Sequence, residues 1–275
     1  MRLVVRTACV LGLASLALSN LAAQGKPLET KATYQGEAAE TFLKKAKIVS
    51  SKPLGQGVTE PKKLTLEMDG VTHNALFKSI DDSKSRVATF AKGQSEVAFQ
   101  DSWQCEIPGY VVDQIIGLGW VPATVERTFN GETGSVQWWV ESKFSEFERN
   151  KQGVNPPNTV QWHHNVLKMR LFDELIYNVD RHANNVLITE DFDLRLIDHS
   201  RAFRPYDRLK SPEVLTQFSR ELLEGIKKLD YQDLRKKVGR YLQNGQIQAL
   251  IKRRDLILAL ADKLIKERGA AAVLY

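Results

Sequence analysis

The sequence is poor in cysteine and lacks internal repeats and low-complexity tracts. Cys9 and Cys105 are the only cysteines among 275 residues, and only Cys105 lies beyond residue 23. If residues 1–23 are removed as a signal peptide, Cys105 is the only cysteine of the mature chain, which excludes an internal disulfide and a disulfide-stapled scaffold. Stability must therefore come from core packing, for which a 43% share of hydrophobic residues is sufficient in one or two domains.

Signatures of zinc and nucleic-acid binding are also missing. The chain has five histidines, and no nucleic-acid-binding module is recognisable. The spacing of four of the histidines matches no common zinc-ligand pattern: His163, His164, His182 and His199. We therefore expect neither a zinc site nor a nucleic-acid partner.

The formal net charge of +6 is modest, and basic residues are concentrated late, in the runs 227–228, 235–240 and 252–254. One interpretation is attraction to an acidic substrate or to an anionic membrane surface. The interleaved Asp and Glu residues favour the other interpretation, which is a set of solvated helix faces.

The amino terminus has the organisation of an export signal. Arg2 and Arg6 precede an uncharged stretch, 7–25, that contains small residues near its end, as is typical of a secretory signal peptide. We expect a cleaved signal at 1–23 and an exported protein, periplasmic or secreted. The alternative is a retained membrane anchor at 7–25, because this stretch is just long enough to span a bilayer.

The most informative motif is the run Asp-Arg-His-Ala-Asn-Asn at 180–185, followed by Asp198. Phosphoryl transfer from a nucleotide needs one carboxylate to accept the proton of the acceptor hydroxyl. It also needs an amide oxygen and a second carboxylate to hold Mg²⁺ against the phosphates. Asp180, Asn185 and Asp198 are the residue types for these three roles. The set predicts an ATP-dependent kinase that uses Mg²⁺ or Mn²⁺, although each residue alone is more typical of a solvated loop.

The elements predicted around this motif agree with that interpretation. Apolar residues recur at three- or four-residue spacing over 162–179, which predicts a helix that ends just before Asp180. Two short strands, 186–189 and 194–197, are predicted next, joined by a polar turn. Asp198 would then follow the end of a strand.

The run at 178–182, together with Asn185, resembles the catalytic loop of atypical protein-kinase-like proteins. Similar families are the HipA-type bacterial kinases, the phosphatidylinositol 3- and 4-kinases, and the secretory-pathway kinases of the four-jointed and Golgi casein kinase type. The resemblance implies a two-lobed α+β fold with a small β-rich N-lobe and a compact helical C-lobe. It also implies Asp180 as the catalytic base, His182 as an accessory catalytic group, and Asn185 and Asp198 as metal ligands.

One departure from these families is the triplet at 198–200, which reads Asp-His-Ser where Asp-Phe-Gly or Asp-Asn-Gly is usual. The missing glycine bears on the flexibility of the loop and not on the metal ligand. The stretch after Asp198 is short for the substrate lobe of a eukaryotic-type kinase, so the likeness is to the compact atypical kinases.

A turn with the features of a phosphate loop lies upstream. Gly55 and Gly57 come between predicted strands at 47–49 and 63–67, and glycines let backbone amides approach phosphate oxygens. Two glycines alone are a weak signal, but the following strands strengthen it.

The Asp-Gly pair at 69–70 predicts a hairpin turn into the next strand, which ends at Lys78. Lys78 occupies the position of the phosphate-binding lysine of kinases. Such a lysine needs a carboxylate partner, for which we favour Glu106, on a helix predicted at 102–118, over Glu96.

Two more strands, 121–125 and 135–140, are predicted to lead into the hinge between the lobes. Trp138 and Trp139 are expected to contribute one ring to the core and the other to an interface. Backbone groups at 140–142 are expected to contact adenine.

A turn-rich stretch after residue 149 divides the chain into an N-lobe and a C-lobe. The predicted segments are the signal 1–23, an N-terminal extension 24–45, the N-lobe 46–150, the C-lobe 151–275, and late helices at 212–227, 230–242 and 253–268.

These features together predict an atypical kinase that binds Mg-ATP between its lobes and transfers the γ-phosphoryl group to a hydroxyl of a protein, lipid or small molecule. Gly55, Gly57, Lys78 and Glu106 would bind the nucleotide. One alternative is an exported pseudokinase that acts as a nucleotide-binding or scaffolding module. Another is an enzyme of the same fold that transfers AMP. We expect a monomer.

Overall fold

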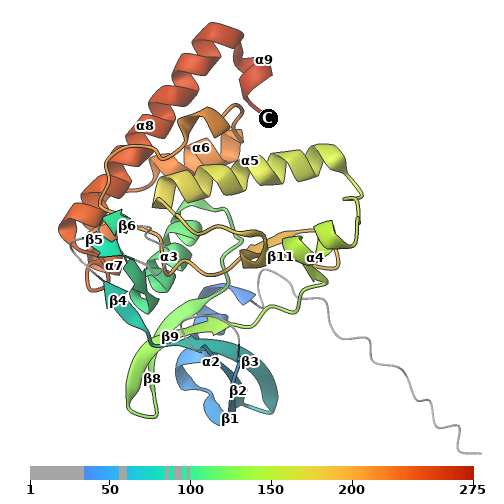
Figure 1. Cartoon of the computed structure of the whole chain (residues 1–275), viewed down its shortest axis with the longest axis vertical. Coiled ribbons are helices and arrows are strands. Elements are labelled where there is room, and N and C mark those ends of the chain that lie inside the picture. Colours follow the sequence, from blue (N-terminus) through green and yellow to red (C-terminus); the bar gives the residue numbers. More distant parts are fainter. Residues whose placement is uncertain (1–33, 56–60, 84–86, 90–94, 98–99) are drawn as a thin grey trace, which may run out of the picture.

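The longest strands gather at one end of the molecule and the longest helices at the other (Figure 1). The computed structural model describes residues 34–55, 61–83, 87–89, 95–97 and 100–275. The predicted signal peptide and Gly57 lie outside the described residues. The α+β architecture, with a β-rich amino-terminal part and a helical carboxy-terminal part, is confirmed.

A five-stranded antiparallel sheet with the order β1-β2-β3-β9-β8 forms the amino-terminal part. Its strands are β1 (Lys47–Pro53), β2 (Lys62–Met68), β3 (Val71–Lys78), β8 (Thr124–Phe129) and β9 (Glu132–Trp138). Alternate residues of β2 and β3 face the core, so that Leu64, Leu66, Ala75 and Phe77 are buried. The first three strands are those predicted from the sequence.

Two dipeptides with left-handed backbones close the hairpins of this sheet. The φ angles are 52° and 76° in the predicted Asp-Gly turn at 69–70, and 51° and 81° in the Asn-Gly turn at 130–131. Such pairs form the two-residue turn whose twist matches the flanking strands. The second turn corrects the strands predicted at 121–125 and 135–140, because β8 and β9 extend to meet it.

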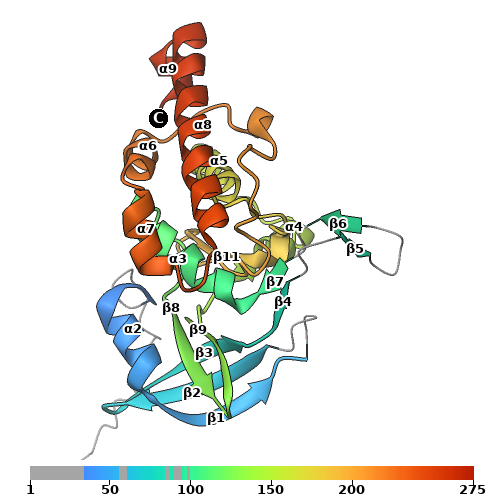
Figure 2. The same ribbon diagram turned by 90° about the vertical axis from the view of Figure 1, so that its left-hand side faces the viewer.

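Helix α2 (Gly36–Lys45) packs on the sheet, in contact with β2, β8 and β9 (Figure 2). Phe42 of this helix meets Trp138 edge to face, with ring centroids 5.6 Å apart. The adjacent Trp139 instead has Lys63 Nζ over its ring, 3.9 Å from the centroid. The two tryptophans thus make separate contacts, of which only that of Trp138 belongs to the core.

Helix α3 (Glu106–Ile116) joins the two parts of the molecule, since it contacts β8 as well as helices α6 and α7. A 3-10 turn, η1 (Trp103–Cys105), precedes it. Pro108 does not interrupt the helix, because it lies in the first turn, where a backbone N–H has no helical partner. A Cβ on Gly109 would lie 3.0 Å from the ring of His199, so this glycine allows a close approach between α3 and that histidine.

The carboxy-terminal part is mostly helical, and its two longest helices contact each other. The helices are α4 (Glu146–Lys151), α5 (Thr159–Ile176), α6 (Arg220–Lys227), α7 (Tyr231–Val238), α8 (Asn244–Arg268) and α9 (Ala270–Val273), with 3-10 turns η2 (Ala183–Asn185) and η3 (Pro212–Val214).

A three-stranded sheet with the order β10-β11-β12 carries the motif loop. Its strands are β10 (Phe144–Ser145), β11 (Val186–Ile188) and β12 (Leu194–Leu196), and the two hairpins elsewhere pair β4 (Asp81–Ser83) with β7 (Gln100–Ser102) and β5 (Val87–Thr89) with β6 (Ser95–Val97). Strands β11 and β12 are as predicted. Strand β10 and helix α4 precede the predicted lobe boundary at 150, yet β10 pairs with β11 and α4 contacts η2 and β11.

The helix predicted at 212–227 is wrong in its first half. Only a 3-10 turn forms at Pro212–Val214, and α6 begins at Arg220. Between them Phe218 forms a bridge with Leu274 at the end of the chain. This long-range pairing fixes an extended backbone where local sequence favours a helix.

Helix α8 is longer than the predicted 253–268. Side chains of Gln243 and Gln246 bond reciprocally to backbone N–H groups and start the helix at Asn244. Its predicted end is confirmed, because Gly269 follows with φ of 83°.

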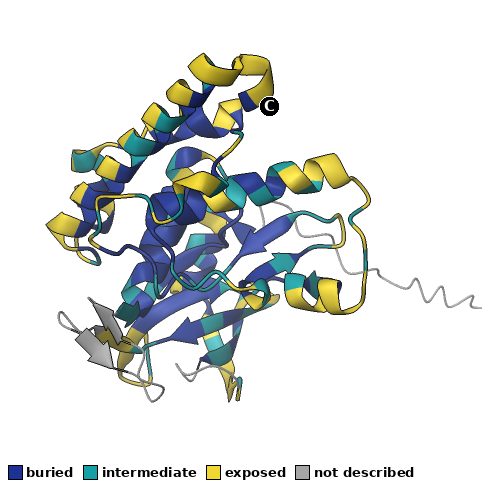
Figure 3. Cartoon of the chain, turned by 45° about the horizontal axis from the view of Figure 1, so that its top comes forward, coloured by how far each residue is buried: buried dark blue, intermediate teal, exposed yellow. Residues whose placement is uncertain are grey.

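Buried residues gather where the sheet and helices meet, and exposed residues cover the outer helix faces (Figure 3). Arg253 on α8 is fully buried and donates to the carbonyl oxygens of Leu175 at 2.8 Å and Arg204 at 3.1 Å. Burial lowers its pKa to about 10. Within the described ranges, no helix combines the length and apolar character needed to cross a bilayer.

Several of the late basic residues are paired on exposed helix faces. Lys227 lies 2.6 Å from Glu224, and Lys237 lies 2.9 Å from Asp233. These pairs agree with the interpretation of the basic runs as solvated faces.

Gly225 on α6 sets the approach of that helix to α3, because a Cβ here would overlap the carbonyl oxygen of Ile116. We expect Gly225→Ala to lower the free energy of unfolding by about 1–3 kcal/mol, the usual cost of overpacking. Gly245 on α8 is a matched control, since nothing lies within 4 Å of an added Cβ. Gly245→Ala should leave stability unchanged or raise it, because Ala is the better helix former. Urea denaturation of the two variants measures the difference, and equal effects would contradict the close crossing.

Candidate active site

The ammonium group of Lys78, at the end of β3, lies between two carboxylates. Its Nζ is 2.6 Å from Glu106 Oε1 on α3 and 2.7 Å from Asp198 Oδ1, which follows β12. These partners are 28 and 120 residues away in the sequence, so the tertiary fold alone brings them together. The predicted ion pair with Glu106 is present. The second one, with Asp198, is not foreseen in the sequence analysis.

All three groups carry their charge at neutral pH. The side chains of Lys78 and Glu106 are 9% and 2% exposed, and that of Asp198 is 34% exposed. Burial lowers the pKa of Lys78, but the charges of Glu106 and Asp198 outweigh burial and raise this pKa overall. Burial raises the pKa of each carboxyl, but the charge of Lys78 and the hydrogen bonds of the carboxyl together outweigh burial and lower both pKa values overall.

Asp198 has a left-handed backbone, with φ of 60°. This region is strained for a residue with a Cβ, and such outliers are concentrated at functional sites. Ser200 Oγ donates to Asp198 Oδ1 at 3.0 Å, and the Ser200 carbonyl accepts from the backbone N–H of Ser102 at 3.0 Å. The residue that replaces the usual glycine therefore helps to hold the aspartate.

Asp180 and Asn185 lie in one loop between α5 and β11, and this loop is bonded to the segment that carries Asp198. The Asn185 carbonyl accepts from the N–H of Ile197 at 3.1 Å, and Asn185 Nδ2 donates to the Asp180 carbonyl at 3.2 Å. Asn185 is 5% exposed, whereas the Asp180 side chain is 41% exposed. The loop thus holds the amide inside and leaves the Asp180 carboxylate open to solvent.

Arg181 connects this loop to its surroundings through every nitrogen of its guanidinium group. Nε lies 3.1 Å from Asp173 Oδ2 on α5, and Nη1 donates to the carbonyls of Asn185 at 3.0 Å and Ile197 at 2.6 Å. Nη2 lies 2.9 Å from His199 Nε2. Arg181 therefore joins the helix before the loop to the segment after β12.

Two basic residues lie close to Asp180. His182 follows it by two residues in the chain, and Arg201 approaches it in space. His182 is exposed, and its Nδ1 accepts from the N–H of Asn184 at 3.3 Å at the start of η2. Arg201 Nη1 lies 3.7 Å from Asp180 Oδ1. A guanidinium group beside the expected base is not foreseen in the sequence analysis.

Gly55 follows β1 and is the last described residue of the turn after this strand. It has φ of 62°, and nothing lies within 4 Å of a Cβ built on it. The N–H of Leu54 donates to the Pro61 carbonyl at 2.9 Å, which closes the loop that contains both candidate glycines. Strand pairing puts this end of β1 at the same end of the sheet as Lys78. Gly57 itself lies outside the described residues.

Two buried acids of α5 are not among the residues predicted for the site. Asp173 and Glu174 are 7% and 2% exposed. Asp173 holds Arg181, and Glu174 accepts from the N–H groups of Lys210 at 2.7 Å and Ser211 at 3.0 Å. Two adjacent acids inside the apolar run of this helix were the available signal, since buried charges need partners.

Asp101 on β7 is another carboxylate near the site that the sequence analysis misses. Burial, and to a smaller extent the charge of Asp198, raises the pKa of Asp101. Its Oδ1 is buried without a hydrogen-bond partner. It lies next to Ser102, whose N–H holds the 198–200 segment.

The oxygen atoms near Lys78 suit a hard divalent cation. Carboxylate and amide oxygens are the side-chain ligands that Mg²⁺ and Mn²⁺ prefer, and such a cation is usually shared with nucleotide phosphates. Asp198 and Asn185 are the candidate ligands, one of each type. In the described part of the chain, no three His, Cys, Asp or Glu side chains are grouped so that they could hold a metal by themselves.

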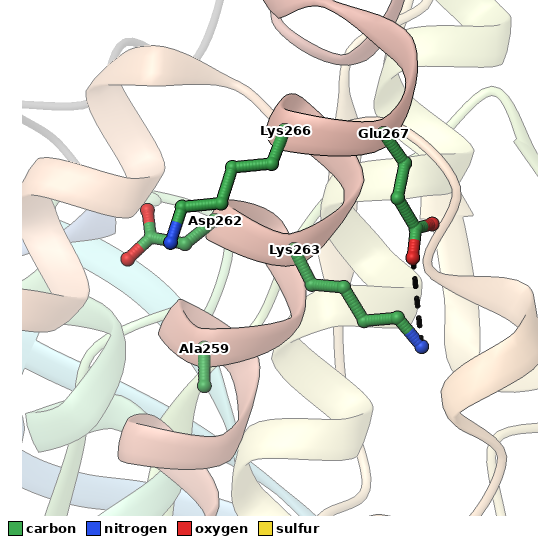
Figure 4. A pocket seen from close by; sticks show the side chains of 5 residues that line it. All are labelled: Ala259, Asp262, Lys263, Lys266 and Glu267. Carbon is green, nitrogen blue, oxygen red and sulfur yellow. Dashed lines mark ion pairs between the residues drawn. The ribbon is translucent and has the colours of Figure 1, made fainter.

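A shallow pocket on α8 is separate from this site (Figure 4). It is lined by one helix only, with Ala259, Asp262, Lys263, Lys266 and Glu267. Lys263 and Glu267 form an exposed pair at 3.8 Å. A surface formed by one helix does not enclose a ligand, so this pocket is not a candidate active site.

Comparisons with solved structures find kinases with a similar fold. A crystal structure of the Golgi casein kinase with Mn and ADP bound aligns with a TM-score of 0.62 and 15% identity, over 86% of this chain and 78% of that chain. A second Golgi casein kinase structure aligns over the same shares, with a TM-score of 0.59 and 14% identity. The chain has a protein-kinase-like fold.

The protein-kinase-like fold confirms the resemblance that the motif loop indicated, at the level of fold. The proinflammatory kinase CtkA of Helicobacter pylori is also similar, with a TM-score of 0.49 and 12% identity over 83% of this chain and 98% of that chain. No protein-family model and no curated protein matches the sequence.

The ion cluster makes a pH-dependent contribution to stability. We expect Glu106→Gln to lower the free energy of unfolding at pH 7 by about 3 kcal/mol, because it breaks a buried pair. The folded-state pKa of Glu106 lies below its ordinary 4.5. The contribution is therefore complete above pH 4.5, and the gap between the two proteins should shrink as pH falls below that value.

Denaturant titrations from pH 7 to pH 3 measure this gap. The control is Glu132→Gln, which removes an exposed partner of Lys62 and should change stability little at any pH. A gap for Glu106→Gln that stays constant down to pH 3 would contradict the charged pair.

Proposed function

We propose that the chain is an atypical kinase that uses ATP and Mg²⁺ or Mn²⁺ to transfer the γ-phosphoryl group to a hydroxyl of a protein, lipid or small-molecule acceptor. The observation that carries this proposal is the contact of Lys78 with both Glu106 and Asp198, next to the loop of Asp180 and Asn185. A kinase needs this combination of one cation, metal-binding oxygens and a base within one site.

Each residue has a role that its surroundings support. Lys78, steadied by Glu106, would bind phosphate oxygens. Asn185 and Asp198 would hold the divalent cation, which neutralises phosphate charge during transfer when it is bound. Asp180 is the exposed carboxylate of the group, so it would orient the acceptor hydroxyl and take its proton.

The remaining predicted residues have supporting roles in this proposal. Gly55 and Gly57 would lie over the phosphates with their backbone N–H groups. His182 would assist near Asp180 as an accessory group. Backbone groups at 140–142 would bind adenine.

The setting is proposed to be outside the cytoplasm. The signal-like amino terminus, 1–23, supports export. The Golgi casein kinase structure with Mn and ADP bound supports the use of a nucleotide and a divalent cation. An exported kinase of this fold would need a compartment supplied with nucleotide, and it is proposed to act as a monomer.

A pseudokinase is the second candidate, favoured by the ion pair between Arg201 and Asp180 at 3.7 Å. A base held by a guanidinium group is compatible with nucleotide binding without turnover. Transfer of AMP in place of phosphate is a third candidate, which the mass added to the product would identify.

Two substitutions separate these functions. Asp180→Asn should reduce phosphoryl transfer by about 10²- to 10⁴-fold, the usual contribution of a general base, and leave ATP binding intact. Asp198→Asn should weaken the binding of ATP in Mg²⁺ or Mn²⁺ far more than in their absence, because it removes a metal ligand. Thermal shifts with and without the cation measure binding, and labelled ATP with a lysate of the host envelope measures transfer.

The control is Asp191→Asn, in the exposed turn between β11 and β12, which should change neither reading. Unchanged transfer in both active-site variants would refute the assignment. Binding of nucleotide by the unmodified chain without transfer to any acceptor would favour the pseudokinase.

A further inference from the structure

His199 lies at the centre of the buried contacts that join the two halves of the site. It is fully buried, and its ring packs edge to face on Phe172, with centroids 5.8 Å apart. Gly109 allows α3 to approach the same ring closely. The ring of His199 is therefore closely packed between α3 and α5. The kinase families that the motif loop resembles usually carry phenylalanine or asparagine at this position of the triplet.

The hydrogen bonds of His199 fix which ring nitrogen carries the proton. Arg181 Nη2 lies 2.9 Å from His199 Nε2. A guanidinium group can only donate, so Nε2 must accept and the proton must lie on Nδ1. Nδ1 lies 3.6 Å from Glu106 Oε2, so the proton-bearing side of the ring faces the carboxylate that holds Lys78.

The backbone of the same residue makes the shorter contact with Glu106. The N–H of His199 donates to Glu106 Oε2 at 3.0 Å, while Oε1 of the same carboxylate accepts from Lys78 at 2.6 Å. One carboxylate therefore bonds to β3 through one oxygen and to the 198–200 segment through the other. Glu106 cannot move without disturbing both.

A continuous chain of contacts results, from Asp173 through Arg181, His199 and Glu106 to Lys78. Arg181 also donates to the backbone carbonyl of Asn185 and to that of Ile197, the residue before Asp198. A shift at any member would be felt at the next, because each is buried and has few alternative partners.

We propose that His199 is a positioning residue that locks the catalytic loop to the Lys78 cluster, through Nε2 to Arg181 and through its backbone N–H to Glu106. Its effect on catalysis rests on the proposed function. Its effect on the geometry of the site does not.

Two substitutions separate the effect of ring packing from the effect of the hydrogen bond to Arg181. His199→Phe keeps an aromatic ring against Phe172 but leaves the Arg181 donor unpaired. His199→Gln loses the ring but places an amide oxygen near the position of Nε2, where it can accept from Arg181. His163→Gln, an exposed histidine of α5, is the control for handling and expression.

The first measurement is steady-state transfer of labelled phosphate from ATP by the full chain. His199→Phe should lower kcat/KM by at least about fivefold, the lower end of the cost of an unpaired buried donor, with a fall in kcat as well as a rise in the KM for ATP. His199→Gln should recover most of this loss. A purely structural role would instead lower the amount of folded enzyme without changing KM.

The second measurement needs no nucleotide. Amide hydrogen exchange should become at least about fivefold faster in the 197–201 segment of His199→Phe, for the same reason, and stay close to the unmodified rate in His199→Gln. If the unmodified chain neither binds ATP nor transfers phosphate, the proposed function fails and this exchange comparison alone decides the role of His199. Should His199→Phe not fold, His199→Met removes the acceptor with a side chain that adapts to irregular space.

Equal loss in the phenylalanine and glutamine variants would show that ring packing matters and not the bond to Arg181, and would overturn the proposal. So would an apolar variant with unchanged exchange and kinetics. Loss in the apolar variant and recovery in His199→Gln support it.

Discussion

The contact of Lys78 with two carboxylates is the interaction on which the rest of the site depends. The Lys78 side chain is 9% exposed, so its ammonium group loses most of its hydration, and nearby negative charge must offset that loss. Glu106 and Asp198 supply this charge, and each is in turn kept ionised by the lysine. The three groups come from a strand, a helix and a loop. The attraction between their charges therefore joins the two parts of the molecule.

Neighbouring residues fix the two carboxylates of this cluster through hydrogen bonds. Glu106 bonds to the backbone of His199, and Ser200 bonds to the side chain of Asp198. The strained backbone of Asp198 is tolerated because these neighbours fix it. Arg181 extends the same network to the loop of Asp180, so this loop and the charged cluster belong to one bonded unit.

The proposed active-site pattern is readable in the sequence because its residues are close together or follow regular elements. The 180–185 run lies between a helix and a hairpin, both with clear apolar periodicity, and Asp198 follows the second strand of that hairpin. Lys78 was found in the same way, at the end of a strand after an Asp-Gly turn. The second hairpin was missed although its Asn-Gly turn at 130–131 carried an equally strong signal. The extended backbone at Phe218 could not be found, since its partner is at the far end of the chain.

The sequence by itself determined the residue types and the local elements that present them, since periodicity and turn chemistry act over a few neighbours. Only the tertiary structure decided which charges meet. The pairing of Lys78 with Asp198 spans 120 residues, and the burial of His199 against Gly109 depends on how α3 crosses the segment after β12. Electrostatic and packing energies of this kind depend on distance in space, for which distance along the chain is no guide.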